Sequence, residues 1–260
     1  MVKRGARLSD LETIKDVIAR QEWAAGRKAI AIDACTSYLH MHGQTWIPPR
    51  YQAEEKLPFI PSEEEIDALI AGCGPKTSTF LQLLKETGMR SGEAQRLRWI
   101  DLDLTAGTVR VTPEKGSRPR IFKLSTKLLG MLLALKAKSR AEHIFCKQLR
   151  TQRRLFQKQR ANLARKLQNP RLSEIHFHTF RHWKATTEYA KTKDILHVMN
   201  ILGHRRIQNT LVYTQLINFE KDDYTAKVAQ STDEASALVE AGFEYVCTTP
   251  EHLMLFRKRK

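Results

Sequence analysis

A run of prolines sets the domain organisation of this chain. Four of them lie close together in the sequence: Pro48, Pro49, Pro58 and Pro61. Because proline removes a backbone donor and clashes with the preceding helical turn, residues 44–60 are predicted to form an extended linker. The 260 residues of the chain suffice for one full-sized core and a smaller appendage. We therefore predict a short helical region over residues 1–50 and a larger unit over residues 51–260.

Helical patterns flank this linker on both sides. Before it, capping signals and apolar spacing predict helices over residues 9–21 and 27–40, which are too few to close an independent bundle. After it, Ser62 and Glu65 form another capping box that begins a helix. The next helix ends at Gly88, a residue suited to the left-handed conformation found at helix C-termini. The chain is therefore predicted to be mainly helical.

The larger unit changes to a period of two over residues 99–124. Alternating apolar residues there predict strands over residues 108–112 and 120–124, joined by a turn with Lys115 at its tip. A leucine-rich helix over residues 128–135 follows and is predicted to be buried in the core. These elements together indicate an α+β protein with a small antiparallel β-sheet.

The C-terminal segment also combines a helix with strands. Ser231 and Glu234 have capping-box spacing, and short strands are predicted over residues 243–247 and 253–256. An apolar stripe in this tail could dock on a neighbouring protomer or fold back on its own domain. The predicted hairpin favours folding back.

The net charge of the chain, +16, indicates a polyanionic partner, and nucleic acid is the leading candidate. Between Glu142 and Glu174 no acidic residue occurs. A sparse apolar stripe there predicts a helix with one buried edge and a broad basic face, as phosphate contact requires. An ordinary solvated helix surface is the alternative. The candidate DNA-binding residues are Lys147, Arg150, Arg153, Arg154, Lys158, Arg160, Arg165 and Lys166.

Membrane insertion, export and metal binding find no support in the sequence. No run of roughly 18 apolar residues occurs and the chain does not begin with a secretory signal pattern, so we expect a cytoplasmic protein. The 4 cysteines are scattered without a CxxC pair, which argues against a zinc site and a disulfide framework. We expect no metal and no other cofactor.

Two arginine motifs are suited to binding a phosphate. His178 and Arg181 are three residues apart, so a helix places both on one face, where they can clamp an anion. Arg90 follows a helix-ending glycine, and Glu93, three residues later, is placed to orient its guanidinium. Each guanidinium carries a permanent charge and planar donors that match two phosphate oxygens.

Further residues could supply the proton transfers and the nucleophile of phosphodiester cleavage. The reaction needs its charge neutralised, a nucleophile aligned and the leaving oxygen protonated. His178 and His204 can donate hydrogen bonds and move protons near neutral pH. Lys115, at its turn, could protonate the leaving 5′ oxygen. Tyr213 is the candidate nucleophile, although its ordinary pKa of about 10 requires help from the surrounding positive charge or from a nearby base.

This set of residues resembles the tyrosine recombinase (phage integrase) family, and in particular its archaeal and viral integrases. The resemblance covers roughly residues 58–230. The family motif combines an arginine in a Thr-Gly-x-Arg-x-x-Glu context, a lysine on a β-hairpin, a His-x-x-Arg pair, a His or Trp after Leu-Gly, and a tyrosine shortly after it. The residues that match in order and spacing are Arg90, Lys115, His178, Arg181, His204 and Tyr213.

The resemblance implies an enzyme with a mainly helical catalytic domain that cleaves and rejoins double-stranded DNA. Tyr213 would attack the scissile phosphate, form a 3′-phosphotyrosyl bond and release a 5′-hydroxyl, and a partner strand would reverse the step without ATP or metal. The family works as a homo-tetramer around two duplexes. Its members usually carry an N-terminal DNA-clamping (core-binding) domain of several helices, of which residues 1–50 supply only part.

Some of these assignments have rivals in the sequence. Three basic residues lie near the candidate lysine: Arg118, Arg120 and Lys123. Lys115 is favoured over them because it alone lies at the turn. Tyr224 is the rival of Tyr213, whose spacing from His204 matches the family better. His182, next to the candidate arginine, is predicted to brace the site or the fold rather than to perform chemistry.

Three functions remain open at this point. The first is a site-specific recombinase, and within that class the integrase of a mobile element, which carries out DNA integration. The second is a type IB topoisomerase-like enzyme that nicks and closes DNA, and the third is a catalytically silent DNA-binding protein. The short chain and the motif spacing favour the first over the second, and the intact set of six residues argues against the third.

Overall fold

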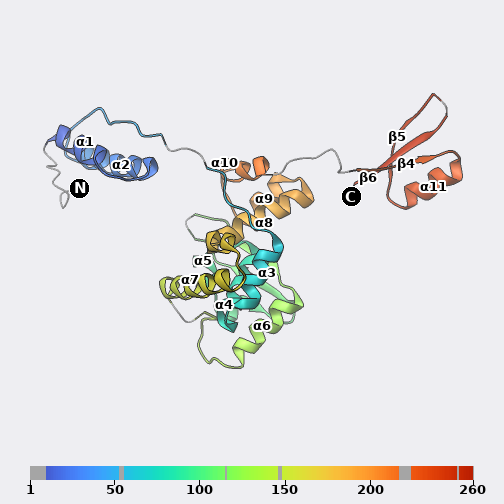
Figure 1. Ribbon diagram of the computed structural model, residues 1–260, viewed down its shortest axis with the longest axis horizontal. Helices are drawn as coiled ribbons and strands as arrows, with labels where there is room; N and C mark the ends of the chain where they lie inside the picture. The colour runs from blue at the N-terminus through green and yellow to red at the C-terminus, as the bar shows by residue number, and fades with distance from the viewer. Residues whose placement is uncertain are drawn as a thin grey trace. The chain divides into compact units, whose positions relative to one another are not determined.

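The computed structural model describes residues 10–52, 56–114, 116–145, 148–216, 224–250 and 252–259. The chain divides into two compact units, Met1–Leu57 and Pro58–Lys260 (Figure 1). Each unit has its own buried cluster. The sequence placed this boundary near residue 50. Two candidate residues, Lys115 and Lys147, lie outside the described residues. None of the helices within these ranges has the length and apolar character needed to cross a membrane.

The smaller unit contains a pair of helices, α1 (Leu11–Ala19) and α2 (Ala25–Met41). Both match the predicted segments to within about two residues at each end. The carboxylate of Asp10 begins α1 by accepting hydrogen bonds from two backbone N–H groups of its first turn, whereas the expected cap, Ser9, lies outside the described residues. The buried side chains that join the two helices are Ile14, Ile18, Ile32 and Cys35.

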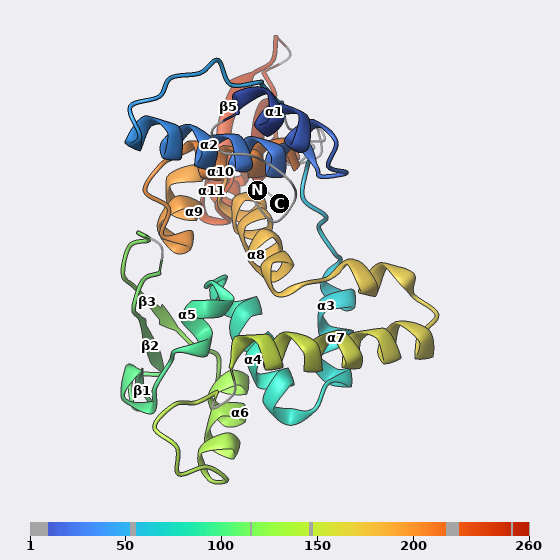
Figure 2. The same ribbon diagram turned by 90° about the vertical axis from the view of Figure 1, so that its left-hand side faces the viewer.

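The larger unit is built around α4 (Pro75–Thr87), which packs against α3 (Glu63–Gly72), α6 (Thr126–Lys136) and α8 (Phe177–Thr192) (Figures 1 and 2). Its further helices are α5 (Ser91–Gln95), α7 (Leu149–Lys166), α9 (Ile195–Leu202), α10 (Gln208–Leu211) and α11 (Thr232–Glu240). Single-turn helices lie at η2 (Trp99–Asp101), η3 (Pro170–Glu174) and η4 (Val212–Leu216). The predicted mainly helical architecture is confirmed.

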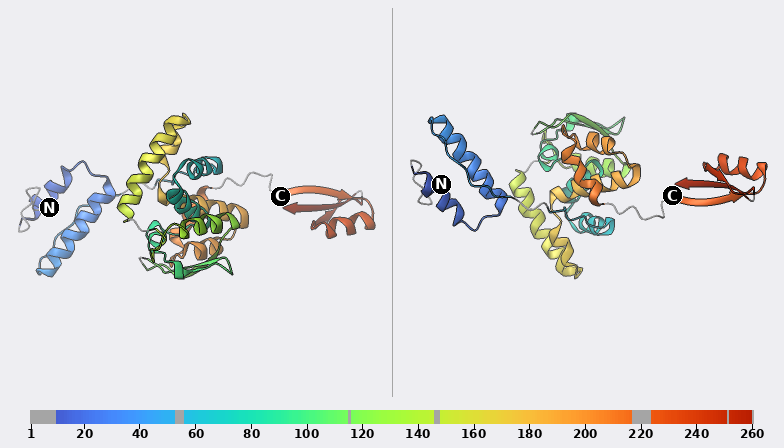
Figure 3. Two further views of the ribbon diagram at one scale, coloured as in Figure 1. Left: turned by 90° about the horizontal axis from the view of Figure 1, so that it is seen from below. Right: turned by 90° about the horizontal axis from the view of Figure 1, so that it is seen from above.

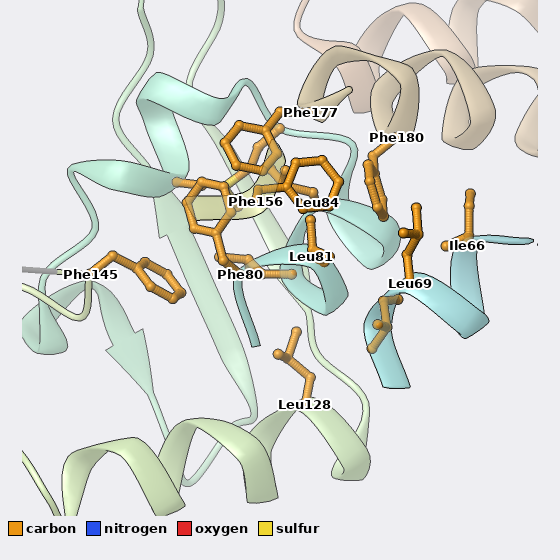
Figure 4. Close-up of a cluster of buried hydrophobic side chains, with 14 of the residues drawn as sticks. Ile66, Leu69, Phe80, Leu81, Leu84, Leu128, Phe145, Phe156, Phe177 and Phe180 are labelled. Carbon is orange, nitrogen blue, oxygen red and sulfur yellow. The ribbon is translucent and has the colours of Figure 1, made fainter. Parts of the chain in front are cut away.

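Aromatic side chains hold α4, α7 and α8 together in the core of the larger unit (Figure 4). The ring of Phe80 on α4 meets that of Phe145 edge to face at 4.9 Å. Phe156 of α7 stacks on Phe177 of α8 with ring centroids 5.0 Å apart. Such pairs add about 0.5 to 1.5 kcal/mol each beyond the burial of their area. The start of α8, which carries the His-x-x-Arg motif, is therefore fixed to the core.

The leucine-rich helix α6 packs along one edge only. Leu128 and Leu132 are fully buried, while Leu133 is 49% exposed. The prediction that this helix is buried in the core was therefore wrong for its outer face. The carboxylate of Glu86 accepts hydrogen bonds from the backbone N–H and the hydroxyl of Ser125, at 3.0 and 2.6 Å, and so fixes the start of α6 against α4.

The first sheet contains the predicted pair of strands and one short strand more. Its antiparallel order is β1 (Leu102–Asp103), β2 (Thr108–Val111) and β3 (Arg120–Lys123), with Val109 opposite Phe122. The small antiparallel β-sheet predicted from the period of two is thereby confirmed. The hairpin between β2 and β3 carries the candidate Lys115 and leads back into Arg120, the first residue of β3.

The C-terminal segment forms a second antiparallel sheet. Its strands are β4 (Tyr224–Ala229), β5 (Glu244–Thr248) and β6 (Met254–Arg259), with β6 in the centre and α11 between β4 and β5 in sequence. The sequence predicted β5 and β6 but not β4, which has only two β-branched residues among its six. Among the residues of this module whose burial the structure describes, Ala229 and Phe256 are buried.

Candidate active site

The guanidinium of Arg181 lies at the centre of the site. Arg181 is only 2% exposed. Its Nη1 donates to the carbonyl of Gly88 at 2.9 Å and its Nη2 donates to the carbonyl of Leu202 at 2.6 Å. These carbonyls end α4 and α9, so Arg181 joins both helices to α8. Burial, with the charges of Arg90 and Arg120, lowers the pKa of Arg181 to about 10, which leaves it charged at neutral pH.

The carboxylate of Glu93 organises the second arginine. It accepts hydrogen bonds from the backbone N–H and the guanidinium of Arg90, at 2.8 and 3.4 Å. It also accepts from the Nη2 of Arg120 at 2.6 Å and from the backbone N–H of Glu114 at 3.3 Å. Glu93 is buried, and each of these contacts fixes a different part of the site. The predicted contact between Glu93 and Arg90 is present, and the same carboxylate also holds the hairpin.

The hairpin beside Lys115 docks on the turn that follows α9. The hydroxyl of Ser117 donates to the carbonyl of Gly203 at 2.8 Å, and the backbone N–H of Arg118 donates to the same oxygen at 3.1 Å. Arg120, which is 8% exposed, donates through Nη1 to the carbonyl of Leu202. Arg181 and Arg120 thus both cap the C-terminal end of α9, where the helix dipole favours positive charge.

The sequence indicates Arg120 only as a rival of the candidate lysine. Its contacts with Glu93 and α9 depend on the register of the hairpin and on the packing of elements far apart in the sequence. No local pattern signals such contacts. The ion pair between the buried residues Arg120 and Glu93 can be recognised only when the positions of the strands are known.

The imidazole of His204 follows directly after this docked turn. Its Nδ1 lies 2.9 Å from the hydroxyl of Thr210, which is fully buried, so the ring is held from the next short helix. Burial lowers the pKa of His204 to about 4, with further contributions from the charges of Arg181, Arg90, Arg120 and His178. At neutral pH the ring is therefore uncharged, and its pKa reflects its closeness to the two candidate phosphate-binding arginines.

Tyr213 points its hydroxyl at a histidine of α8. The Oη of Tyr213 lies 3.1 Å from the Nδ1 of His182, and the tyrosine is only 2% exposed. Its neighbours in this small cluster are Ala185, Val198 and Leu202. Burial raises the pKa of Tyr213, while the charge of Arg181 opposes that rise. The hydroxyl therefore carries its proton at neutral pH in this arrangement.

His178 lies at the first turn of α8, exposed, beside a pocket. The pocket has a volume of about 430 Å³, and its lining includes Arg90, His178, Arg153 and Phe156. It thus extends from the candidate phosphate-binding residues to the helix with the basic face. The rings of His178 and His182 meet edge to face at 4.5 Å, so the exposed histidine is connected to the one that contacts Tyr213.

Most of the predicted basic residues lie on the outer face of α7, which Figure 3 shows as a long helix. The exposed ones are Arg150, Arg153, Arg154, Lys158, Arg165 and Lys166. Arg160 differs because its guanidinium donates to the carbonyl of Ile175 and lies 2.9 Å from the Nδ1 of His176. Burial lowers the pKa of Arg160. Its contacts hold α7 against the start of α8.

A family model and individual relatives both match this chain, and they indicate the same family. The model of the phage integrase family matches residues 62–218. A tyrosine recombinase of Pseudothermotoga lettingae is 32% identical over 158 residues, which are 58% of this chain and 53% of that protein, so the chain spans about half of that relative. The tyrosine recombinase XerC of Xanthomonas campestris pv. campestris is 28% identical over 231 residues, covering 81% of this chain and 71% of the relative.

Solved structures show the same fold. The XerH site-specific recombinase bound to its difH substrate, in a pre-cleavage complex, has a TM-score of 0.60 at 20% identity, covering 82% of this chain and 68% of that one. The XerA recombinase has a TM-score of 0.53 at 22% identity, covering 83% and 80%. The predicted catalytic-domain fold is therefore confirmed. The narrower resemblance to archaeal and viral integrases stays a prediction.

Proposed function

The chain belongs to the phage integrase family of tyrosine recombinases, and from this premise we propose that it cleaves DNA strands at a specific site and rejoins them through Tyr213. The observation that carries the proposal is a set of contacts around the end of α9. Arg181 and Arg120 both donate to the carbonyl of Leu202, two residues before His204, and Tyr213 packs in the same cluster as Leu202. Glu93 joins Arg120 to Arg90. A phosphate bound there would meet two permanent positive charges and a tyrosine oxygen.

Each residue has a part in the proposed reaction. The Oη of Tyr213 attacks the scissile phosphorus, the bond from phosphorus to the 5′ oxygen breaks, and a 3′-phosphotyrosyl bond remains. Arg90 and Arg181 neutralise the charge of the pentavalent transition state. His204 donates a hydrogen bond, and Lys115 or His178 supplies the proton that the leaving 5′ oxygen takes up. Attack by another 5′-hydroxyl on the phosphotyrosine reverses every bond change.

The exposed basic face of α7 supports double-stranded DNA as the partner, since positive charge of a single sign tracks phosphates. We propose that the active assembly on DNA is a homo-tetramer, as the family implies, and that residues 1–50 contribute part of the DNA clamp. The proposed setting is the cytoplasm, with integration of a mobile element as the biological role.

A type IB topoisomerase-like enzyme is the second candidate, because the chemistry is shared. Its substrate is one supercoiled duplex, whereas a recombinase needs two duplexes. Family membership favours the recombinase. A catalytically silent DNA-binding protein is the third candidate, and it is disfavoured by the order and spacing of the six motif residues.

Trapping a covalent protein–DNA adduct tests this proposal. The protein is incubated with a library of nicked duplexes of randomised sequence, in which the short strand beyond the cleavage site diffuses away and prevents rejoining. DNA that stays bound in denaturing detergent is recovered and sequenced. We expect an adduct with the wild-type chain and none with Tyr213→Phe, which keeps the ring and loses the nucleophile.

The outcomes separate the three functions. An equal yield of adduct from Tyr213→Phe would assign the nucleophile to another residue, and no adduct from the wild-type chain would favour the silent DNA-binding protein. The recovered sequence then serves in a second assay. Recombinant products from two duplexes that carry it support the recombinase, whereas relaxation of a supercoiled plasmid that carries one copy, without recombinants, supports the topoisomerase-like enzyme.

A further inference from the structure

His182 is the residue whose ring nitrogen contacts the oxygen of the proposed nucleophile. The 3.1 Å separation of Nδ1 and Oη is a hydrogen-bond distance, and the ring centroids are 5.8 Å apart. His182 belongs to α8 and Tyr213 to η4, two elements that pack against each other. The contact is therefore made by the fold and does not follow from closeness in sequence.

The packing around Tyr213 keeps bulk water away from its hydroxyl. The residue is 2% exposed and lies among Ala185, Val198 and Leu202. A phenol must lose its proton as its oxygen forms a bond to phosphorus. In this buried position the imidazole of His182, rather than solvent, adjoins that proton.

The protonation state of His182 suits a proton acceptor. Burial lowers the pKa of His182 to about 4, with smaller contributions from the positive charges of His178 and Arg181, which lie on the same helix. The ring is therefore neutral at pH 7, and the tautomer with its proton on Nε2 leaves the Nδ1 lone pair free to accept from the O–H of Tyr213. A phosphate bound at Arg181 would offset those charges and raise the pKa of His182, making it a stronger base.

We propose that His182 is the proton acceptor for Tyr213, an inference that rests on the DNA-cleaving function proposed above. As the Oη of Tyr213 bonds to phosphorus, the phenolic proton passes to the Nδ1 of His182, while the leaving 5′ oxygen takes a proton from Lys115 or His178. During rejoining, the phosphorus–tyrosine bond breaks and His182 returns the proton to the departing tyrosine oxygen. The attacking 5′-hydroxyl gives its own proton back to the residue that supplied it.

A role as proton acceptor differs measurably from the bracing role that the sequence suggested. A brace is needed whatever the protonation state of Tyr213. A proton acceptor is needed only while the phenol holds its proton. Making the phenol more acidic should therefore remove the need for His182 if it accepts the proton, and leave that need unchanged if it braces.

The test measures single-turnover adduct formation on the DNA sequence recovered in the trapping assay. His182→Asn places a carbonyl oxygen near the position of Nδ1, so it can accept a hydrogen bond but cannot take the proton. We expect adduct formation to slow by about 100-fold or more, the range typical of acid–base catalysis, with the affinity for DNA unchanged. The matched control is His197→Asn on α9, whose side chain is 44% exposed and pairs with Glu188 rather than with Tyr213; we expect its rate to equal that of the wild type.

The decisive variant replaces Tyr213 by 3,5-difluorotyrosine, a close mimic of tyrosine with a more acidic phenol. In the His182→Asn background we expect this change to restore most of the lost rate and to move the pH profile of cleavage to lower pH. A thermal melt of each variant checks that the fold is intact.

Two results would overturn the proposal. The first is a wild-type cleavage rate in His182→Asn, and the second is a slowed variant whose rate the fluorinated tyrosine leaves unchanged, which would assign His182 a bracing role. The absence of any adduct from the wild-type chain is a different result, because it contradicts the proposed function itself.

Discussion

Replacing Gly203 with alanine tests how tightly the hairpin is held against α9. Gly203 has a φ of +67°, in the left-handed region. A Cβ added there would lie 2.6 Å from the Oγ of Ser117 and 2.8 Å from the Nη1 of Arg120. Both atoms are the ends of side chains, but both side chains are buried and hydrogen-bonded to the end of α9. They cannot move aside without losing those bonds.

The expected loss of stability has two parts. A left-handed backbone costs an L-residue about 1 to 2 kcal/mol. Each displaced hydrogen bond costs about 0.5 to 1.5 kcal/mol more, and two bonds, from Ser117 and Arg120, are at risk. We therefore expect Gly203→Ala to lower the free energy of unfolding by about 2 to 5 kcal/mol.

Gly116→Ala is the matched control. Gly116 has a φ of +70° and no heavy atom within 4 Å of an added Cβ, so only the backbone cost applies. Urea unfolding followed by tryptophan fluorescence gives the free energy of both variants. We expect Gly203→Ala to lose about 1 to 3 kcal/mol more than Gly116→Ala, the share of the hydrogen bonds. Equal losses in the two variants would refute the inference that the hairpin is held closely against Gly203.

Two further predictions concern DNA. Arg181→Lys should slow adduct formation by about 100-fold or more while the dissociation constant for DNA stays within a few-fold, because lysine lacks the planar fork; an unchanged cleavage rate would contradict the assigned role. Replacing both Arg153 and Arg154 by glutamine should reduce the slope of log affinity against log salt by about 2. The same change at Lys136 and Lys138, which are exposed at and just after the end of α6, should leave the slope unaltered. An equal effect of both pairs would mean that α7 makes no special contact with DNA.

The elements that local sequence signals specify were predicted well. The capping box of Ser62 and Glu65 is present at the start of α3, and the hydroxyl of Ser231 accepts from the backbone N–H of Glu234 at the start of α11. Strand β4 was missed because two of the six residues in Tyr224–Ala229 are alanine and only two are β-branched, a composition that favours a strand weakly. The exposure of Leu133 was missed because composition shows that a helix is apolar but not how many of its sides are covered.

In the site, too, the residues of a local sequence motif were predicted, whereas contacts between distant elements were not. The motif identified which residues to expect, and the fold brings Arg90, Arg181, His204 and Tyr213 together, while their catalytic roles and that of Lys115 stay predictions. Arg120 and the contact of His182 with the tyrosine were not foreseen, because each depends on two elements that meet only after folding. Arg160 was grouped with the DNA-binding residues by its charge alone, and its contacts in the fold could not be read from composition.

The two carbonyl oxygens that hold Arg181 have a consequence for the energetics of substrate capture. Ordering a long side chain costs about 1.5 to 2 kcal/mol of conformational entropy. For Arg181, the packing of α4, α8 and α9 offsets this loss of conformational entropy before DNA binds. A phosphate then meets a guanidinium that is already oriented, and the affinity gained at this position depends on how well α9 stays folded. A substitution that loosens α9 far from the DNA would therefore weaken phosphate binding without removing a single contact to it.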